Sequence, residues 1–256
     1  MTAPKPDVSI VIATYNAESF IEDSLRQIED IMNATVFNYE LIFVDDKSSD
    51  QTVSIIRRIM QDKSHWSLTV HRKNHGRGKT VHDGIKKATG DIVGFIDIDL
   101  DNPARYIFSM ILGIKNGGYD VCTADRNYKW RWGIYFVIRM ILSQGYALLS
   151  SFLMGTGLKD SETGCKFFKK KAILSVLAET KSRGWFWDTE IMTRAHYHGL
   201  KILEIPTLFI RNTRVTTVNL IPDTLRYLAS LIRFIPVKNE LKNKYEKQQS
   251  PSIYTL

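Results

Sequence analysis

The chain has 256 residues, enough for one sizeable α/β domain, and its 44% hydrophobic and 24% charged residues exclude an intrinsically disordered protein. Its net charge of +8 favours an anionic partner, such as nucleic acid, an anionic membrane surface or a phosphorylated substrate. Cys122 and Cys165 form no CxxC pair, so we expect both to be reduced and structural. We also expect no secretory signal, because the first residues lack a basic region followed by a long apolar stretch.

The first half of the sequence alternates apolar, β-branched runs with helical patterns. The runs predict strands at Val8–Ala13, Glu40–Asp45, Ser67–Arg72, Asp91–Asp97 and Asp120–Ala124. Periodic apolar residues predict helices over residues 21–32, from Ser48 onward, and at about 78–88 and 103–117. This alternation is typical of an α/β fold with a mostly parallel sheet flanked by helices.

Two long helices in the second half are predicted to lie at a membrane surface. Gly133–Met154 is unusually apolar, but it holds Arg139, which is costly inside a bilayer. We therefore expect an interfacial helix there, with packing in the core as the alternative, and an amphipathic helix over about 219–235 beside it. Between them, strands are predicted near 166–168 and 201–205 and helices near 172–179 and 188–197. We expect residues 1–237 to form one domain and residues 238–256 a polar tail.

Acidic side chains gather where the predicted strands end. Ligands of parallel sheets bind beyond the carboxyl ends of the strands, and Asp45–Asp46, Asp97–Asp99 and Asp125 are expected at that edge. Residues two apart on an extended segment point the same way, so Asp97 and Asp99 can converge on one point. Two carboxylates and phosphate oxygens are suitable ligands for Mg²⁺ or Mn²⁺. The motif therefore predicts a metal site that holds a diphosphate, with two solvated turn aspartates as the alternative.

The loops after the second and third predicted strands offer further contacts. Asp45 and Asp46 are placed to accept hydrogen bonds from a nucleobase or ribose, while Ser49 or Asp50 caps the next helix. The segment from Asn74 to Thr80 is similar to a phosphate-binding P-loop, but Lys73 stands where that motif requires glycine. This argues against a P-loop nucleoside triphosphatase. Arg77 and Lys79, at the start of a helix, remain candidates for holding an anion.

Several segments in a fixed order carry a resemblance to a known family. They read VSIVIATYN, FVDDKSSDQT, NHGRGKTVHDGI, FIDIDLDNP, DSETGCK, FWDTE and LEIPTLFIRNTR. This series resembles the family 2 glycosyltransferases with a GT-A fold, and within them the dolichol-phosphate mannose synthase and polyprenyl-phosphate glycosyltransferase branch. The matches run from Val8 to about Asp223. The resemblance implies a Rossmann-like GT-A catalytic domain.

The resemblance also implies roles for individual positions. Together with the residues above, it predicts a nucleotide-sugar site formed by Ala13, Tyr15, Glu18, Val44, Asp45, Asp46, Lys79, Asp97, Ile98, Arg211 and Arg214. It places Asp99 and Asp101 on metal-associated positions, and it suggests Arg126, Arg131 and Lys169 as ligands of the acceptor phosphate. Ala13 replaces the family's usual proline and Ala17 a usual glutamate, so the identities of the base and sugar are not implied.

The implied reaction is inverting transfer of a hexose, mannose or glucose, from a GDP- or UDP-sugar to a polyprenyl or dolichyl phosphate. A phosphate oxygen is already anionic, so catalysis would rest on the metal ion held by Asp97 and Asp99 and on Arg126. The alternative acceptor is a saccharide hydroxyl, whose proton either Asp188 and Glu190, or Asp160 and Glu162, would accept. We expect a peripheral or monotopic enzyme on the cytoplasmic face of a membrane. No nucleic-acid partner is expected, since the basic residues are not interleaved with aromatic ones.

Overall fold

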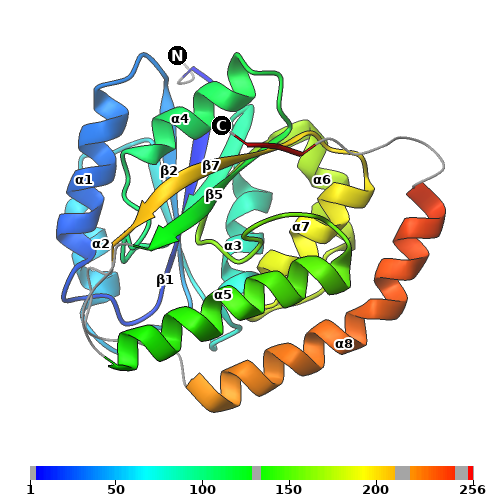
Figure 1. Ribbon diagram of the computed structural model, residues 1–256. Coiled ribbons are helices and arrows are strands. Elements are labelled where there is room, and N and C mark those ends of the chain that lie inside the picture. Colours follow the sequence, from blue (N-terminus) through cyan, green and yellow to red (C-terminus); the bar gives the residue numbers. More distant parts are fainter. Residues whose placement is uncertain (1–3, 129–133, 211–219, 246–252, 256) are drawn as a thin grey trace.

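The computed structural model of the protein describes residues 4–128, 134–210, 220–245 and 253–255 (Figure 1). They form an eight-stranded sheet in the order β3-β2-β1-β4-β6-β5-β7-β8. The strands are β1 (Val8–Thr14), β2 (Tyr39–Asp45), β3 (Trp66–Val70), β4 (Ile92–Ile96), β5 (Val121–Tyr128), β6 (Cys165–Lys169), β7 (Ile202–Phe209) and β8 (Ile253–Thr255). The predicted α/β class with a mostly parallel sheet is confirmed.

One strand of the sheet runs against the others. β6 pairs antiparallel with both β4 and β5, whereas the remaining neighbours are parallel. In the register of β4 and β6, Ile96 lies opposite Cys165 and Ile92 lies opposite Lys169. The segment that precedes β6 is therefore delivered to the edge where β1, β2 and β4 end.

Helices cover both faces of the sheet. They are α1 (Ile21–Asn33), α2 (Thr52–Ile59), α3 (Arg77–Lys87), α4 (Tyr106–Lys115), α5 (Ile134–Met154), α6 (Lys170–Glu179), α7 (Trp187–Tyr197) and α8 (Leu220–Tyr245). Apolar residues of α1, α2 and α4 pack with one face of the strands. Those of α3, α6 and α7 pack with the other. Successive strand residues point to opposite faces of the sheet, so Ile10 packs in one core and Val11 packs in the other.

Helices α5 and α8 lie side by side along the outside of the domain (Figure 1). A third apolar cluster joins them to α7 and to the segment before it, through Met154, Phe186, Tyr227 and Phe234. The ring centroids of Tyr146 on α5 and Tyr227 are 4.0 Å apart. Within the described residues, no helix combines the length and the apolar character that crossing a bilayer requires.

Helix α8 is longer than predicted and crosses the boundary that we expected between the domain and a polar tail. It continues through Pro236 to Tyr245 instead of ending near residue 235. Leu241 on this extension is buried with the α8 core residues, which explains why a segment of polar composition stays helical. Ile253–Thr255 then pairs with β7 as an edge strand.

Candidate active site

The predicted nucleotide residues gather at the carboxyl ends of β1 and β2. Ala13 lies beside Val44 in the register of the two strands, and Tyr15 follows β1 with 44% of its surface exposed. The Val44 side chain is fully buried, so Val44 offers a ligand only its backbone. Ile98 also packs in the core. Glu18 accepts a hydrogen bond from the backbone N–H of Gln51 (2.8 Å), which fixes the start of α2.

The carboxylates of Asp45 and Asp46 shape the loops around this edge. Asp45 is buried and accepts hydrogen bonds from the Thr14 hydroxyl (3.0 Å) and from the backbone N–H of Ser48 (2.8 Å). Asp46 accepts hydrogen bonds from the backbone N–H groups of His75 and Gly76, both at 2.8 Å. Its Oδ1 also lies 2.8 Å from Nδ1 of His71. Both side chains thus hold in place the loops of the candidate nucleotide site.

Three carboxylates follow β4. Burial, together with the charges of Asp97 and Asp101, raises the pKa of Asp99 to about 7. A divalent cation would relieve this repulsion, so the residues present fit a metal site. Among the described residues, no group of three or more His, Cys, Asp or Glu side chains could hold a metal ion. A cation bound by Asp97 and Asp99 would therefore also need oxygen ligands from the substrate, as Mg²⁺ and Mn²⁺ commonly do.

Arg77, at the first position of α3, connects the metal motif to α7. Its Nε donates to Oδ1 of Asp97 (2.8 Å), and its Nη1 donates to Oδ2 of Asp188 (2.5 Å). Lys166 lies on β6 with its side chain fully buried, and its Nζ donates to Oδ1 of Asp188 (2.8 Å). Two cations therefore neutralise Asp188 from both sides. The predicted base Asp188 is near Asp97, but it is held in a buried ion-pair network.

The segment before β6 completes this part of the site. The backbone N–H of Asp97 donates to the carbonyl of Gly164 (2.8 Å). A Cβ atom at Gly164 would come within 1.9 Å of Oδ2 of Asp97. Only glycine therefore leaves room for this carboxylate. Gly164 and Lys166 were missed as site residues, and Arg77 was predicted only as a candidate for holding an anion. All three lie inside the quoted motifs, but a motif does not say which distant side chain each member contacts.

The predicted acceptor side lies around Arg126 on β5. Its guanidinium contacts both oxygens of Asp160, with Nη2 to Oδ1 at 2.8 Å. Glu162 accepts a hydrogen bond from the Tyr227 hydroxyl (2.7 Å). Burial, with the charges of Asp160 and Asp188, raises the pKa of Glu162 to about 8. Arg126 and Glu162 thus belong to one group of charged side chains, which also includes Asp188.

Five predicted site residues either need correction or lie outside the described residues. Lys169 is at the wrong edge of the sheet, because β6 runs antiparallel and carries it about 13 Å from Cys165, which is beside Asp97. Lys79 pairs with Asp83 on its own helix. Arg131, Arg211 and Arg214 lie outside the described residues.

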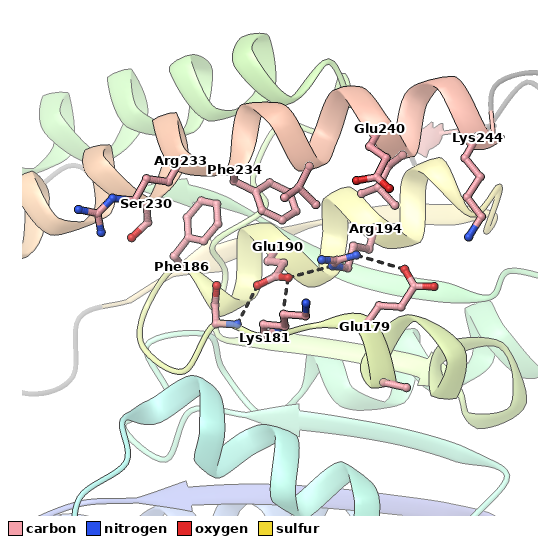
Figure 2. A pocket seen from close by; sticks show the side chains of 14 residues that line it. Glu179, Lys181, Phe186, Glu190, Arg194, Ser230, Arg233, Phe234, Glu240 and Lys244 are labelled. Atoms are coloured by element: carbon pink, nitrogen blue, oxygen red, sulfur yellow. Dashed lines mark hydrogen bonds and ion pairs between the residues drawn. The ribbon is translucent and has the colours of Figure 1, made fainter.

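Glu190 is not part of this site. Its carboxylate accepts hydrogen bonds from the backbone N–H groups of Lys181 (3.1 Å) and Ser182 (2.8 Å) and from Nε of Arg194 (2.9 Å). Figure 2 shows these contacts in a groove of about 700 Å³ between the α6–α7 segment and α8. Glu190 is buried behind the loop that it anchors, so its position does not suit the predicted role of catalytic base.

Comparisons with known proteins find similar glycosyltransferases. Glycosyltransferase AglD of Haloferax volcanii is 27% identical over 236 residues, which cover 91% of this chain and 37% of that protein. Dolichol-phosphate mannosyltransferase of Pyrococcus furiosus is 29% identical over 210 residues, which cover 79% of this chain and 56% of that protein. The chain therefore spans about a third to a half of the length of these relatives.

A solved structure has the same fold. It is glucosyl-3-phosphoglycerate synthase from Mycobacterium tuberculosis in complex with Mn²⁺, UDP-glucose and phosphoglyceric acid. The TM-score is 0.66 at 19% identity, with 90% of this chain and 80% of that chain covered. This likeness confirms the predicted GT-A fold. The family described as glycosyl transferase family 2 matches residues 9–177, and the chain belongs to that family.

Proposed function

We propose that the protein is an inverting, metal-dependent hexosyltransferase that moves a sugar from a GDP- or UDP-sugar to a polyprenyl phosphate. The observation that carries this proposal is the position of Asp97 and Asp99. The strand that they follow, β4, lies between β1, whose carboxyl end suits a nucleotide, and β5, which carries Arg126 and suits an anionic acceptor. Transfer of a sugar from a nucleotide donor to a phosphorylated acceptor requires that both substrates bind next to the same carboxylates.

The carboxylates after β4 suit Mg²⁺ or Mn²⁺. Asp97 and Asp99 would hold the ion, and Asp101 adds negative charge beside them. When bound, the cation would stabilise negative charge on the departing nucleoside diphosphate. The M. tuberculosis synthase that shares the fold was crystallised with Mn²⁺ and UDP-glucose, which supports both a metal and a nucleotide-sugar donor.

The chain's own residues would align the reactants and stabilise charge. In the proposed step an oxygen of the acceptor phosphate forms a bond to the anomeric carbon, and the bond from that carbon to the diphosphate breaks. The diphosphate keeps the electron pair, and no proton moves, because the attacking oxygen is already anionic. Arg77 and Lys166 keep Asp188 and Asp97 in place, and Arg126 offers a fixed guanidinium to an acceptor phosphate.

Exposed apolar side chains support a lipid acceptor. Leu148 and Phe152 on α5 are 72% and 81% exposed, and Leu225 and Ile232 on α8 are each 62% exposed. The two helices lie side by side (Figure 1), so these residues offer an apolar surface to the acyl region of a membrane. We place the enzyme on the cytoplasmic face of a membrane as a peripheral or monotopic protein. The similarity to a dolichol-phosphate mannosyltransferase supports this acceptor.

The test is transfer of radiolabel from a panel of GDP- and UDP-sugars to a polyprenyl phosphate, with Mn²⁺ or Mg²⁺, followed by organic extraction. We expect label in the lipid phase, and we expect EDTA to block it. Asp99→Ala should abolish transfer with an unchanged circular dichroism spectrum, whereas Lys169→Ala, at the opposite edge of the sheet, should keep full activity. Donor turnover without a lipid product would instead favour a saccharide hydroxyl acceptor, with Asp188 or Glu162 as the base.

A further inference from the structure

Trp185, in the segment between α6 and α7, exposes an unusual amount of apolar surface beside the candidate active site. It is 42% exposed, whereas the other tryptophans of the described chain, Trp66 and Trp187, are 5% and 0% exposed. An exposed indole leaves apolar area in water, and a ligand that covered this area would gain affinity. Its position therefore calls for an explanation other than core packing.

The segment that carries Trp185 is fixed against α3. Glu190 accepts hydrogen bonds from two backbone N–H groups at its start. The carbonyl of Arg183 accepts a hydrogen bond from the backbone N–H of Lys79 (2.8 Å). Gly78 permits this close approach, because a Cβ atom there would come within 2.6 Å of the carbonyl oxygen of Gly184. Trp185 is thus held on a segment that both neighbours restrain.

The indole of Trp185 lies over the guanidinium that binds the metal motif. The Cζ atom of Arg77 is 5.5 Å from the ring centroid of Trp185 and 5.4 Å from that of Phe95. The same guanidinium donates to Asp97 at 2.8 Å. Arg77 therefore contacts both Trp185 and Asp97, the carboxylate proposed to hold the metal and the donor diphosphate. A sugar attached to that diphosphate would lie within reach of the indole.

We propose that Trp185 is a binding residue for the transferred hexose, whose C–H face stacks on the exposed part of the indole. The proposal rests on the proposed function, since it needs a sugar nucleotide as the donor. The face of an aromatic ring carries partial negative charge and attracts the partially positive hydrogens of a pyranose. Arg77 holds the indole by a cation–π contact, so the ring is oriented before the ligand arrives.

The experiment compares a sugar nucleotide with its bare nucleotide. Affinities for UDP-glucose and UDP, and for GDP-mannose and GDP, are measured by calorimetry with Mn²⁺ for the full chain. Trp185→Ala should weaken binding of the sugar nucleotide about tenfold and change binding of the diphosphate less than about twofold. Trp185→Phe should recover most of the loss. Phe108→Leu, which changes an exposed aromatic residue on α4, is the matched control and should alter neither affinity.

A second readout uses the indole itself. The fluorescence of Trp185 is the part of the wild-type emission that Trp185→Phe lacks. Acrylamide should quench this emission in the free protein. UDP-glucose or GDP-mannose should protect it from quenching, whereas UDP or GDP should not. Equal weakening of sugar nucleotide and nucleotide by Trp185→Ala would overturn the proposal, because Trp185 would then act only on Arg77 and Asp97. No change in either affinity would also overturn it. A wild type that binds none of the four ligands would instead overturn the proposed function, and this inference with it.

Discussion

Asp97 and Gly164 lie so close that the carboxylate occupies the space of a missing side chain. A Cβ atom on Gly164 would be 1.9 Å from Oδ2 of Asp97, although the two residues belong to different loops at the sheet edge. The Asp97 carboxylate packs against the backbone of Gly164, and the hydrogen bond from the Asp97 N–H to the Gly164 carbonyl holds the two residues together. The metal motif is therefore shaped by the segment before β6 as much as by β4.

Gly164→Ala should displace the Asp97 carboxylate and lower turnover by about 100-fold, because small misplacements of aligned groups cost rates of this order. The measurement is kcat for sugar transfer at saturating Mn²⁺. Gly145→Ala on α5 is the matched control, since a Cβ atom there meets nothing within 4 Å. Equal activity of the two variants would contradict the role of the Asp97–Gly164 contact.

Arg77→Ala should lower the free energy of unfolding by about 3–5 kcal/mol, because it leaves Asp97 and Asp188 without their shared cation. Arg77→Lys should recover only part of this loss, because an ammonium group cannot reproduce the fixed guanidinium geometry that pairs with both Asp97 and Asp188. Urea denaturation monitored by circular dichroism measures the change. Arg226→Ala, which removes an ion pair whose arginine side chain is 80% exposed, should change stability by less than about 0.5 kcal/mol. A similar small effect for Arg77→Ala would show that Lys166 alone suffices for Asp188.

Glu162 gives the protein a pH-dependent stability. Its pKa is about 8 in the folded chain and near 4.5 when exposed, so the folded state binds more protons between these values. The stabilisation from protonated Glu162 is complete below pH 4.5 and is lost as pH rises through 8. Glu162→Gln keeps an acceptor for the Tyr227 hydroxyl and should raise Tm at pH 8 by about 2–4 °C relative to wild type, with little change at pH 5.

The control for this experiment is Glu240→Gln, which changes an exposed carboxylate on α8. It should leave the dependence of Tm on pH as it is in the wild type. If Glu162→Gln and the wild type lose stability in parallel from pH 5 to pH 8, the raised pKa of Glu162 is wrong.

Phe152→Glu should weaken binding to phospholipid vesicles by about tenfold, because the exposed ring on α5 would otherwise enter the acyl region and gain about 1.5–3 kcal/mol. Vesicle flotation with increasing lipid measures the partition. Val36→Glu is the control, since Val36 is 92% exposed and lies between α1 and β2, away from α5 and α8. Equal partition of both variants would remove the membrane surface from the proposed function.

Most of the fold was predictable because its signals are local. The strand predicted at Val8–Ala13 is Val8–Thr14 in the structure, and the helix predicted at 188–197 is Trp187–Tyr197. The direction of β6 was not predictable, because Cys165–Phe168 is buried on both faces and such a run looks the same in either orientation. The length of α8 was also missed, since Pro236 and the polar residues after it suggest an end that the burial of Leu241 overrides.

The candidate site was predictable only in part. Asp45 ends β2, Asp46 comes directly after it and Asp97 comes directly after β4, so their common edge could be inferred from strand order alone. The contact between Arg77 and Asp188 joins residues 111 positions apart, and no local pattern encodes it. Glu190 was misplaced for a related reason. Glu190 was predicted together with Asp188 as a candidate base, but two residues along a helix turn the side chain to another face.

The antiparallel strand β6 also divides the sheet into two groups of strands. Strands β1 to β4 carry the candidate nucleotide edge, strands β5, β7 and β8 lie on the side of Arg126, and the β4–β6 pair joins the two groups. Loops on one side can lengthen or change sequence without moving a strand on the other. Residues 121–209 nevertheless supply Gly164, Lys166 and Asp188 to the surroundings of Asp97 and Arg77, so an exchange of this segment between relatives would have to preserve these three residues.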